Sequence, residues 1–464
     1  MLFSSIVFLS LFLPVLLAVY YLSEKRSRNL ILLLFSLLFY GWGEPVLLSV
    51  MLLSIIWNYI IAILVGKVNS KWLRIPILFI GIILNLLCLG YFKYMDFFIE
   101  NINCLFHTNL SLLHIVMPIG ISFYTFQAIS YLVDVYRKDV KAEKSILNVG
   151  LYITFFPQLI AGPIVKFHEI ANDIRNREET LSGFSTGMQR FIEGLAKKVL
   201  IANVMASMAD SVFNRGIPEL TSADLWLGAA AYSFQIFFDF SGYSDMAIGL
   251  GKMFGFNIPE NFNYPYVSKT ITEFWRRWHI SLSTWFKEYL YIPLGGSRCS
   301  KIAVLRNLLI VFAVTGIWHG ASWTFLVWGL WHGFFIILER ISGLNKKVFH
   351  PVAAFFMHIY LLFVVLIGWI FFRADDFDYS FAFLKKMFSF ERWNDLTVTV
   401  SPFFILTSFT AIFFSTELPR KIYTKMKDNI VFTILWKTVC IFLLFLVFVR
   451  LASSSYNPFI YFRF

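Results

Sequence analysis

The chain has 464 residues, of which 58% are hydrophobic and only 15% carry a charge, against roughly 45–50% and about 25% in soluble globular proteins. So little polar surface excludes a soluble enzyme, and at roughly 20 residues per crossing the length allows many membrane helices. The net charge of +12 lies in short basic clusters between apolar runs, which is typical of cytoplasmic loops rather than of nucleic-acid binding. We therefore expect an integral membrane protein with no nucleic-acid partner.

Apolar runs separated by basic clusters define the predicted topology. The clusters at 25–28, 67–74 and 137–144 follow the first, third and fifth runs, which places them in the cytoplasm and the N-terminus outside. We expect an all-α polytopic fold with about twelve crossings, a single membrane domain over 1–464, and both chain ends outside. The runs lie near 5–22, 29–41, 46–65, 75–92, 112–133, 146–165, 199–213, 225–250, 306–318, 321–338, 352–372, 402–416 and 430–449.

One of these runs is predicted not to cross. Pro157 and Pro163 interrupt the run 146–165, and the loop that follows it, 166–179, is rich in charge. Keeping that loop in the cytoplasm requires the run to enter and leave on the same side. Such re-entrant backbone is tolerated where protein or a water-filled cavity surrounds it.

The alternation of runs and basic clusters predicts that the segment 251–305 lies in the cytoplasm. Thr270 and Glu273 have the spacing of a capping box, which predicts the start of a helix. A helical wheel over 272–290 has one aromatic and one basic face, as in helices that lie at a membrane interface. The aromatic face includes Trp275, Trp278 and Trp285, and the basic face includes Arg276, Arg277 and Lys287.

His279 falls at the edge of that aromatic face, beside Phe286, when residues are placed about 100° apart. The residues alone leave two interpretations open. His279 is either a core histidine hydrogen-bonded to backbone or a polar group that lines a substrate path.

His319 follows the short apolar run 306–318 and is the first candidate for catalysis. A dozen helical residues rise about 18 Å, short of the roughly 30 Å hydrocarbon core, so we expect His319 inside the membrane at a helix break made by Gly316 and Gly320. An ionisable residue at that depth indicates a functional site, and imidazole can take a proton from an attacking hydroxyl. The alternative is an interfacial pair with Trp318. His332 repeats the Trp-His-Gly triplet, and we expect it mainly to pack helices.

Other polar residues interrupt the apolar runs. Gln235 and Asp239 lie within 225–250, where they are expected to face the interior of the bundle. They either hold helices together or take part in the chemistry. Gln127 ends a segment with Pro118 and Gly120 that suits a tunnel wall, although small-residue helix packing explains that segment equally well.

Several motifs are discounted. Gly183 to Gly187 matches G-x-S-x-G, but a nucleophile elbow needs a strand-to-helix turn in an α/β sheet, so we expect Ser182 or Ser185 to cap a helix instead. The four cysteines are scattered without a C-x-x-C pair, which indicates neither a disulfide framework nor a zinc site. We expect no metal and no bound cofactor.

Several long motifs together resemble the membrane-bound O-acyltransferase family, in particular its alginate O-acetylation and peptidoglycan O-acetyltransferase branch. The resemblance runs the length of the chain. It implies a ring of about 11–12 tilted helices around a central tunnel, with His319 as the essential histidine and His279 as the second histidine in a cytoplasmic funnel. The motifs are 156–163 (FPQLIAGP), 260–266 (ENFNYPY), 274–285 (FWRRWHISLSTW), 289–296 (YLYIPLGG), 318–323 (WHGASW) and 368–375 (GWIFFRAD).

The resemblance also implies an activity. We expect a bacterial inner-membrane O-acetyltransferase that takes an acetyl group from cytoplasmic acetyl-CoA, or another acyl thioester, for an extracytoplasmic polysaccharide such as alginate or peptidoglycan. A secreted SGNH-type transferase or esterase and membrane lipids are the expected partners. The alternatives are D-alanyl transfer to teichoic acid and a passive polymer or lipid transporter whose histidines relay protons.

The aromatic C-terminal tail, 451–464, is the last candidate. One interpretation is an aromatic belt at the membrane interface. The other is that Pro458 turns the chain back and presents the hydroxyl of Tyr461 to His319, so that tyrosine holds the acyl group as an ester. The tail resembles an aromatic-tyrosine motif that relays acyl groups in related systems. Tyr456 is the competing tyrosine.

Overall fold

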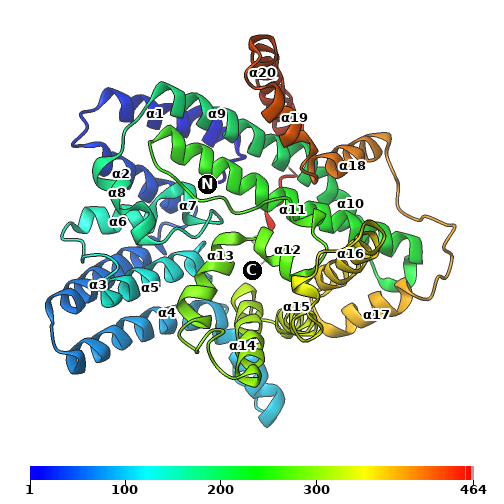
Figure 1. The fold of residues 1–464 in the computed structure, drawn as a ribbon, viewed down its shortest axis with the longest axis horizontal. Coiled ribbons are helices and arrows are strands. Elements are labelled where there is room, and N and C mark those ends of the chain that lie inside the picture. The colour runs from blue at the N-terminus through cyan, green and yellow to red at the C-terminus, as the bar shows by residue number, and fades with distance from the viewer. Residues whose placement is uncertain (455, 461–464) are drawn as a thin grey trace. The chain divides into compact units, whose positions relative to one another are not determined.

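The computed structural model describes residues 1–454 and 456–460, and in these residues it contains helices and no β-strand. The chain forms two compact units, Met1–Phe191 with Asp245–Pro259, and Ile192–Ser244 with Glu260–Phe464. Helices α9 (Leu181–Ala196) and α11 (Ser222–Met253) belong partly to each unit, because the boundaries fall inside them. The predicted all-α class is confirmed (Figure 1). The single membrane domain stays a prediction.

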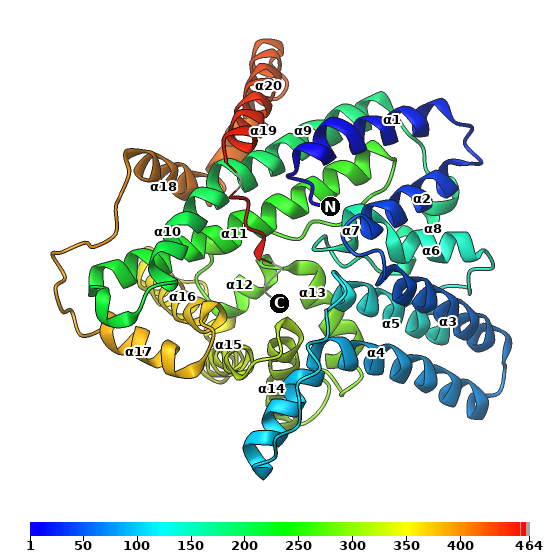
Figure 2. The same ribbon diagram turned by 180° about the vertical axis from the view of Figure 1, so that it is seen from behind.

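The first unit is a bundle of apolar helices in which α5 is the most enclosed. Nearly every residue of α5 is buried, and α5 packs against α3 and α4 (Figure 2). The helices of this unit, besides its parts of α9 and α11, are η1 (Phe8–Phe12), α1 (Leu13–Leu22), α2 (Arg28–Gly41), α3 (Leu48–Lys67), α4 (Lys71–Phe106), α5 (Ile121–Arg137), α6 (Ile146–Thr154), α7 (Phe156–Leu159) and α8 (Phe167–Asn176).

The proline-containing run 146–165 is broken, as its composition predicts. It forms α6 and the four-residue α7, with the break at Phe155 and Pro157 in the first turn of α7. Residues 149–167 are all buried in the protein, which is the surrounding that irregular backbone at membrane depth requires. Re-entry on one side of the membrane stays a prediction.

The second unit holds most of the long C-terminal helices around a large aromatic core that includes Phe274, Trp328 and Trp369. Its helices, besides its parts of α9 and α11, are η2 (Lys197–Ala202), α10 (Asn203–Phe213), η3 (Ile217–Glu219), η4 (Pro265–Val267), α12 (Ile271–Arg277), α13 (Ile280–Phe286), η5 (Lys287–Tyr291), α14 (Lys301–His319), α15 (Trp323–Ser342), η6 (Leu344–Lys346), α16 (Pro351–Arg373), α17 (Phe377–Met387), α18 (Pro402–Phe414), α19 (Leu418–Met426) and α20 (Ile430–Ser453).

Two glycines allow α14 and α15 to lie almost backbone to backbone. A Cβ on Gly316 would lie 2.4 Å from the carbonyl oxygen of Phe325, and one on Gly329 would lie 2.3 Å from that of Phe312. Small residues permit such close approach of membrane helices. This packing fixes the two helices that carry His319 and His332.

Six described helices are long and apolar enough to cross a membrane by themselves, and the bent pair α18 and α19, which meet at 67°, brings the number to at most seven. The chain is a multi-pass membrane protein, as predicted. Shorter apolar helices cover Phe8–Leu22 and Arg28–Gly41, so the expected total of about twelve crossings stays a prediction. The six are α3, α4, α14, α15, α16 and α20.

Candidate active site

The helix predicted over 272–290 is interrupted at His279, so the prediction of one continuous helix is wrong. The helix starts as predicted, since the Thr270 hydroxyl accepts a hydrogen bond from the Glu273 N–H at 3.0 Å. It ends after Arg277, and His279 adopts a left-handed conformation with φ 44° before α13 begins. Such a conformation costs energy in a residue other than glycine and needs support from its surroundings.

Asn261 supplies that support. Its carbonyl oxygen accepts the Ile280 N–H at 2.9 Å, and its side-chain oxygen accepts the Ser281 N–H at 3.1 Å and the Ser281 hydroxyl at 2.8 Å. In an uninterrupted helix those two N–H groups would have bonded to carbonyls four residues back. Sequence reasoning missed Asn261 as a site residue, although the ENFNYPY motif contains it.

The same amide sets the tautomer of His279. Nδ1 of His279 lies 3.2 Å from the side-chain oxygen of Asn261, and because that oxygen is an acceptor, Nδ1 must carry the hydrogen. Nε2 then keeps the lone pair, and no group among the described residues lies within hydrogen-bond distance of it. Burial lowers the pKa of His279 to about 3, which keeps the imidazole neutral, with a lone pair at Nε2 that can accept a hydrogen bond. Its partner is a side chain and not the backbone.

A buried carboxylate holds the beginning of α12. Glu339 of α15 is fully buried and accepts hydrogen bonds from the Ile271 N–H at 2.6 Å and from the Thr272 N–H at 2.9 Å. A negative charge at a helix N-terminus is favourable because the first N–H groups have no partner within the helix. Glu339 therefore ties the helix that precedes His279 to α15, a role the sequence did not indicate.

The predicted aromatic side chains of this segment are buried. The ring of Trp278 stacks on Phe274 with centroids 5.4 Å apart and touches Trp369 at 4.9 Å, and Trp275 contacts Trp328 at 5.6 Å. Trp285 packs on other aromatic rings of its own segment. His279 itself lies against other rings, those of Phe240 at 4.5 Å and Phe262 at 6.5 Å between centroids.

His319 is the last residue of α14, and the predicted reason for its depth is wrong. The helix has 19 residues and rises about 28 Å, because it begins at Lys301, after the Ser300 cap, and so includes residues 301–305, which precede the predicted run. It ends at Gly320 in extended conformation, whereas Gly316 lies inside the helix. The ring of His319 is nearly buried.

Three aromatic rings from successive helices surround His319. The centroids of Trp318, Trp328 and Phe372 lie 4.9, 4.9 and 5.3 Å from that of His319. The indole of Trp318 also contacts His279, at 6.4 Å between centroids. The structure therefore brings the two predicted histidines to the same tryptophan, although 40 residues separate them in the chain.

His332 is enclosed by rings from α12, α15 and α16. It contacts Trp275 at 5.3 Å and Trp328 at 5.4 Å, and its Nε2 lies 2.7 Å from where a Cβ on Gly368 would be. Neither nitrogen has a hydrogen-bond partner among the described residues. A packing role stays the prediction for this residue.

The remaining tunnel candidates have separate surroundings. Gln127 is buried in α5 of the first unit. Gln235 is buried in α11 of the second unit, and Asp239, one turn further along, pairs with Lys198 at 2.8 Å. The G-x-S-x-G segment lies within α9, whose start is capped by Thr180 rather than Ser182 or Ser185. Tyr461 lies outside the described residues.

The three residues of the predicted basic face differ in their surroundings. Arg277 pairs with Glu273 at 3.0 Å and with Glu417 at 3.1 Å, whereas Arg276 and Lys287 are exposed. Bonds from Lys421 and Arg277 hold the pKa of Glu417 below its usual range.

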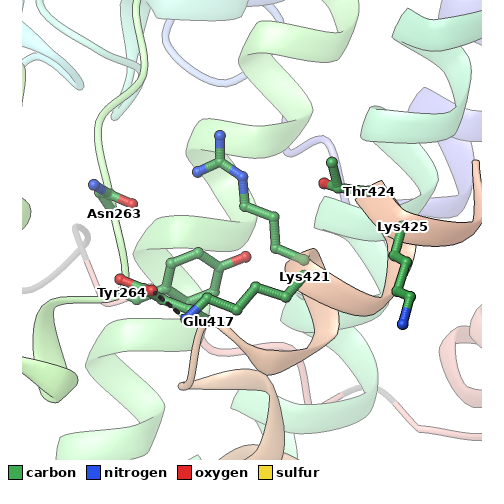
Figure 3. A pocket seen from close by; sticks show the side chains of 7 residues that line it. Asn263, Tyr264, Glu417, Lys421, Thr424 and Lys425 are labelled. Atoms are coloured by element: carbon green, nitrogen blue, oxygen red, sulfur yellow. Dashed lines mark ion pairs between the residues drawn. The ribbon is translucent and has the colours of Figure 1, made fainter.

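Glu417 and several residues of α19 line a basic groove that the sequence did not predict (Figure 3). Its volume is about 500 Å³, and Glu417 is its single acidic side chain beside three basic ones, one of which, Lys421, pairs with it at 3.1 Å. Anions are the ligands that such a surface favours. The lining residues are Asn263, Tyr264, Glu417, Arg420, Lys421, Thr424 and Lys425.

Comparison with known proteins gives this arrangement its context. The membrane-bound O-acyltransferase family model matches residues 141–374. The probable alginate O-acetylase AlgI of Pseudomonas putida is 40% identical over the whole of both chains, and that of Pseudomonas syringae pv. tomato is 44% identical over 85% of this chain and 76% of its own. The peptidoglycan O-acetyltransferase of Helicobacter pylori is 36% identical over 83% and 80%. The chain therefore belongs to the membrane-bound O-acyltransferase family and is an O-acyltransferase.

Proposed function

We propose that this enzyme moves an acetyl group from a cytoplasmic thioester across the bacterial inner membrane for O-acetylation of a polysaccharide, alginate or peptidoglycan being the polymers named for its relatives. The observation that carries the proposal is the contact of both His279 and His319 with Trp318 inside an apolar core. Two imidazoles at one buried point suit proton transfer during attack on a thioester.

In the proposed reaction, His319 is the general base. A hydroxyl oxygen bonds to the carbonyl carbon of the thioester while its proton moves to the neutral imidazole, and the carbon–sulfur bond breaks. The departing thiolate then takes that proton. The aromatic rings around His319 exclude water, which protects the thioester from hydrolysis and strengthens electrostatic interactions at the site. His279, with its lone pair at Nε2, accepts a hydrogen bond beside His319 and so helps to orient the attacking hydroxyl.

The proposed donor is acetyl-CoA, with the basic groove as the site of its phosphates. Arg420 and Lys425 line the groove, and guanidinium groups bind phosphates through paired hydrogen bonds. Arg277 is not assigned to this task, because it already pairs with Glu273 and Glu417. Donor binding and chemistry thus use different residues.

The proposed acceptor is Tyr461, which passes the acetyl group to a secreted SGNH-type partner. A phenol has a pKa near 10 and needs a neighbouring base to attack a thioester. The topology with both chain ends outside brings the tail to the extracytoplasmic side. Tyr456 lines a cavity of about 500 Å³, and we expect the partner to approach the tail there.

Purified enzyme with labelled acetyl-CoA tests the proposal, with and without the secreted protein encoded by a neighbouring gene. Label should reach the partner or its polymer, and His319→Ala should lower that transfer by about 10²–10⁴-fold, the contribution of a general base. Tyr461→Phe should lower transfer to background while donor binding persists. Transfer of a D-alanyl thioester in place of acetyl, or label that never leaves the donor, would overturn the proposal.

A further inference from the structure

Residues 456–460, which follow α20 in the chain, pack into the second unit. Figures 1 and 2 show it, in red, leaving α20 and running to α11. The side chains of Phe459 and Ile460 are 5% and 4% exposed, although most of α20 itself is exposed. A segment that follows an exposed helix and is itself buried needs a specific means of attachment.

A buried ion pair provides it. Lys198 of η2 and Asp239 of α11 are 2.8 Å apart, with their side chains 3% and 2% exposed. Removing two charges from water is costly unless further hydrogen bonds satisfy the remaining proton donors and oxygen atoms. Among the described residues near the pair in the helices, Asn203 supplies one such bond, because its side-chain oxygen accepts from the Lys198 ammonium at 2.9 Å.

Two backbone groups of the segment 456–460 supply further hydrogen bonds to this ion pair. The Lys198 ammonium donates to the carbonyl oxygen of Pro458, and the second oxygen of Asp239 accepts the Ile460 N–H at 2.9 Å. The two charges therefore hold the backbone on either side of Phe459, one at a carbonyl and the other at an N–H. A grip on two backbone groups of opposite polarity determines both the direction and the register of the segment.

Side-chain contacts continue along the same segment. The ring of Phe459 lies over Tyr243 at 5.2 Å, the Asn203 amide donates to the Asn457 side chain at 3.2 Å, and the Tyr456 hydroxyl donates to Asp210 at 2.6 Å. Each residue from 456 to 460 thus has a contact with the second unit. An ion pair that only joined η2 to α11 would not use its remaining bonds on the tail.

We propose that Lys198 and Asp239 are positioning residues that clamp the segment 456–460 inside the second unit, and so set the place from which the chain continues to Tyr461. This inference rests on the proposed acyl relay for its functional part. The clamp itself is independent of that relay, because it concerns only where the segment 456–460 is held.

Hydrogen–deuterium exchange of the C-terminal peptide in the full-length protein tests the clamp. The double variant Lys198→Met/Asp239→Leu removes both charges together, since loss of one alone would leave the other buried and unpaired. We expect exchange at Ile460 to become at least tenfold faster. Arg28→Met/Glu179→Leu is the matched control, because that ion pair, 2.8 Å long and with side chains 12% and 7% exposed, lies in the first unit.

Acetyl transfer to the partner and the Kd for acetyl-CoA are measured on the same variants. Transfer should fall at least tenfold while this Kd stays within about twofold, a separation that general misfolding would not produce. Lys198→Gln/Asp239→Asn, which removes both charges but keeps a hydrogen-bond donor and an oxygen acceptor at the two positions, should give intermediate values and serves if the first double variant is not recovered. Unchanged exchange in both would refute the clamp. Faster exchange with full transfer would refute the positioning role and leave the clamp standing. Full transfer by Tyr461→Phe would refute the relay and would not bear on the clamp.

Discussion

Replacement of Asn261 by alanine tests the geometry of the site most directly. The variant loses the oxygen that accepts from Nδ1 of His279, from the Ser281 N–H and from the Ser281 hydroxyl. At about 1 kcal/mol for each net hydrogen bond, the loss of stability is about 3 kcal/mol. The chain should still fold, because the apolar core of the second unit does not depend on this amide.

The effect on activity should exceed the effect on stability. Without the acceptor, Nδ1 is no longer held as the protonated nitrogen, and the left-handed conformation of His279 loses its support. We expect kcat for acetyl transfer to fall about 10–100-fold, less than removal of a general base, with KM for the donor nearly unchanged. Steady-state transfer by the purified protein measures both constants.

Two further variants sharpen this test. Asn261→Asp keeps an acceptor for Nδ1 and for Ser281, and its negative charge should raise the pKa of His279, so activity should return in part with a shifted pH profile. Asn257→Ala is the control, because this exposed asparagine bonds to Asp173 in the first unit. Wild-type kcat in a folded Asn261→Ala protein would refute the assigned tautomer and its role.

Two other predictions follow from the groove and from the buried histidine. Arg420→Gln with Lys425→Gln should raise KM for acetyl-CoA several-fold, an effect that 0.5 M salt should mask because exposed charges are screened; the same change at Lys346 and Lys347 should leave KM unchanged, and an unaltered KM in the groove variant would exclude the groove as the phosphate site. The pKa of His279 is about 3 in the folded protein and 6.5 in the unfolded chain, so the unfolded state binds more protons between these values and stability falls as pH drops below about 6.5. Between pH 6.5 and 5 this costs about 2 kcal/mol, and His279→Gln should therefore lose less thermal stability on acidification than wild type when both are followed in detergent.

Composition and short-range patterns are enough to predict the class of the protein and much of its local structure. Composition excluded a soluble chain, and apolar runs located helices such as α3, α15, α16 and α20 to within a few residues. The start of α12 at Thr270 was also predictable. These features depend on residues that are close in the chain, since a cap acts within one helical turn and an apolar stretch is a single continuous run of about 20 residues.

The break between α12 and α13 at His279 depends on tertiary contacts. The pattern over 272–290 is continuous and amphipathic, and nothing within it ends the helix. The break depends on Asn261, 18 residues away from His279, and the start of α12 is held by Glu339, 68 residues from Ile271. Hydrogen bonds between residues so far apart in the chain form only when packing brings their helices together, so no local pattern encodes them. For the same reason hydropathy shows an apolar run at 306–318, but only packing shows that Trp318 touches both histidines.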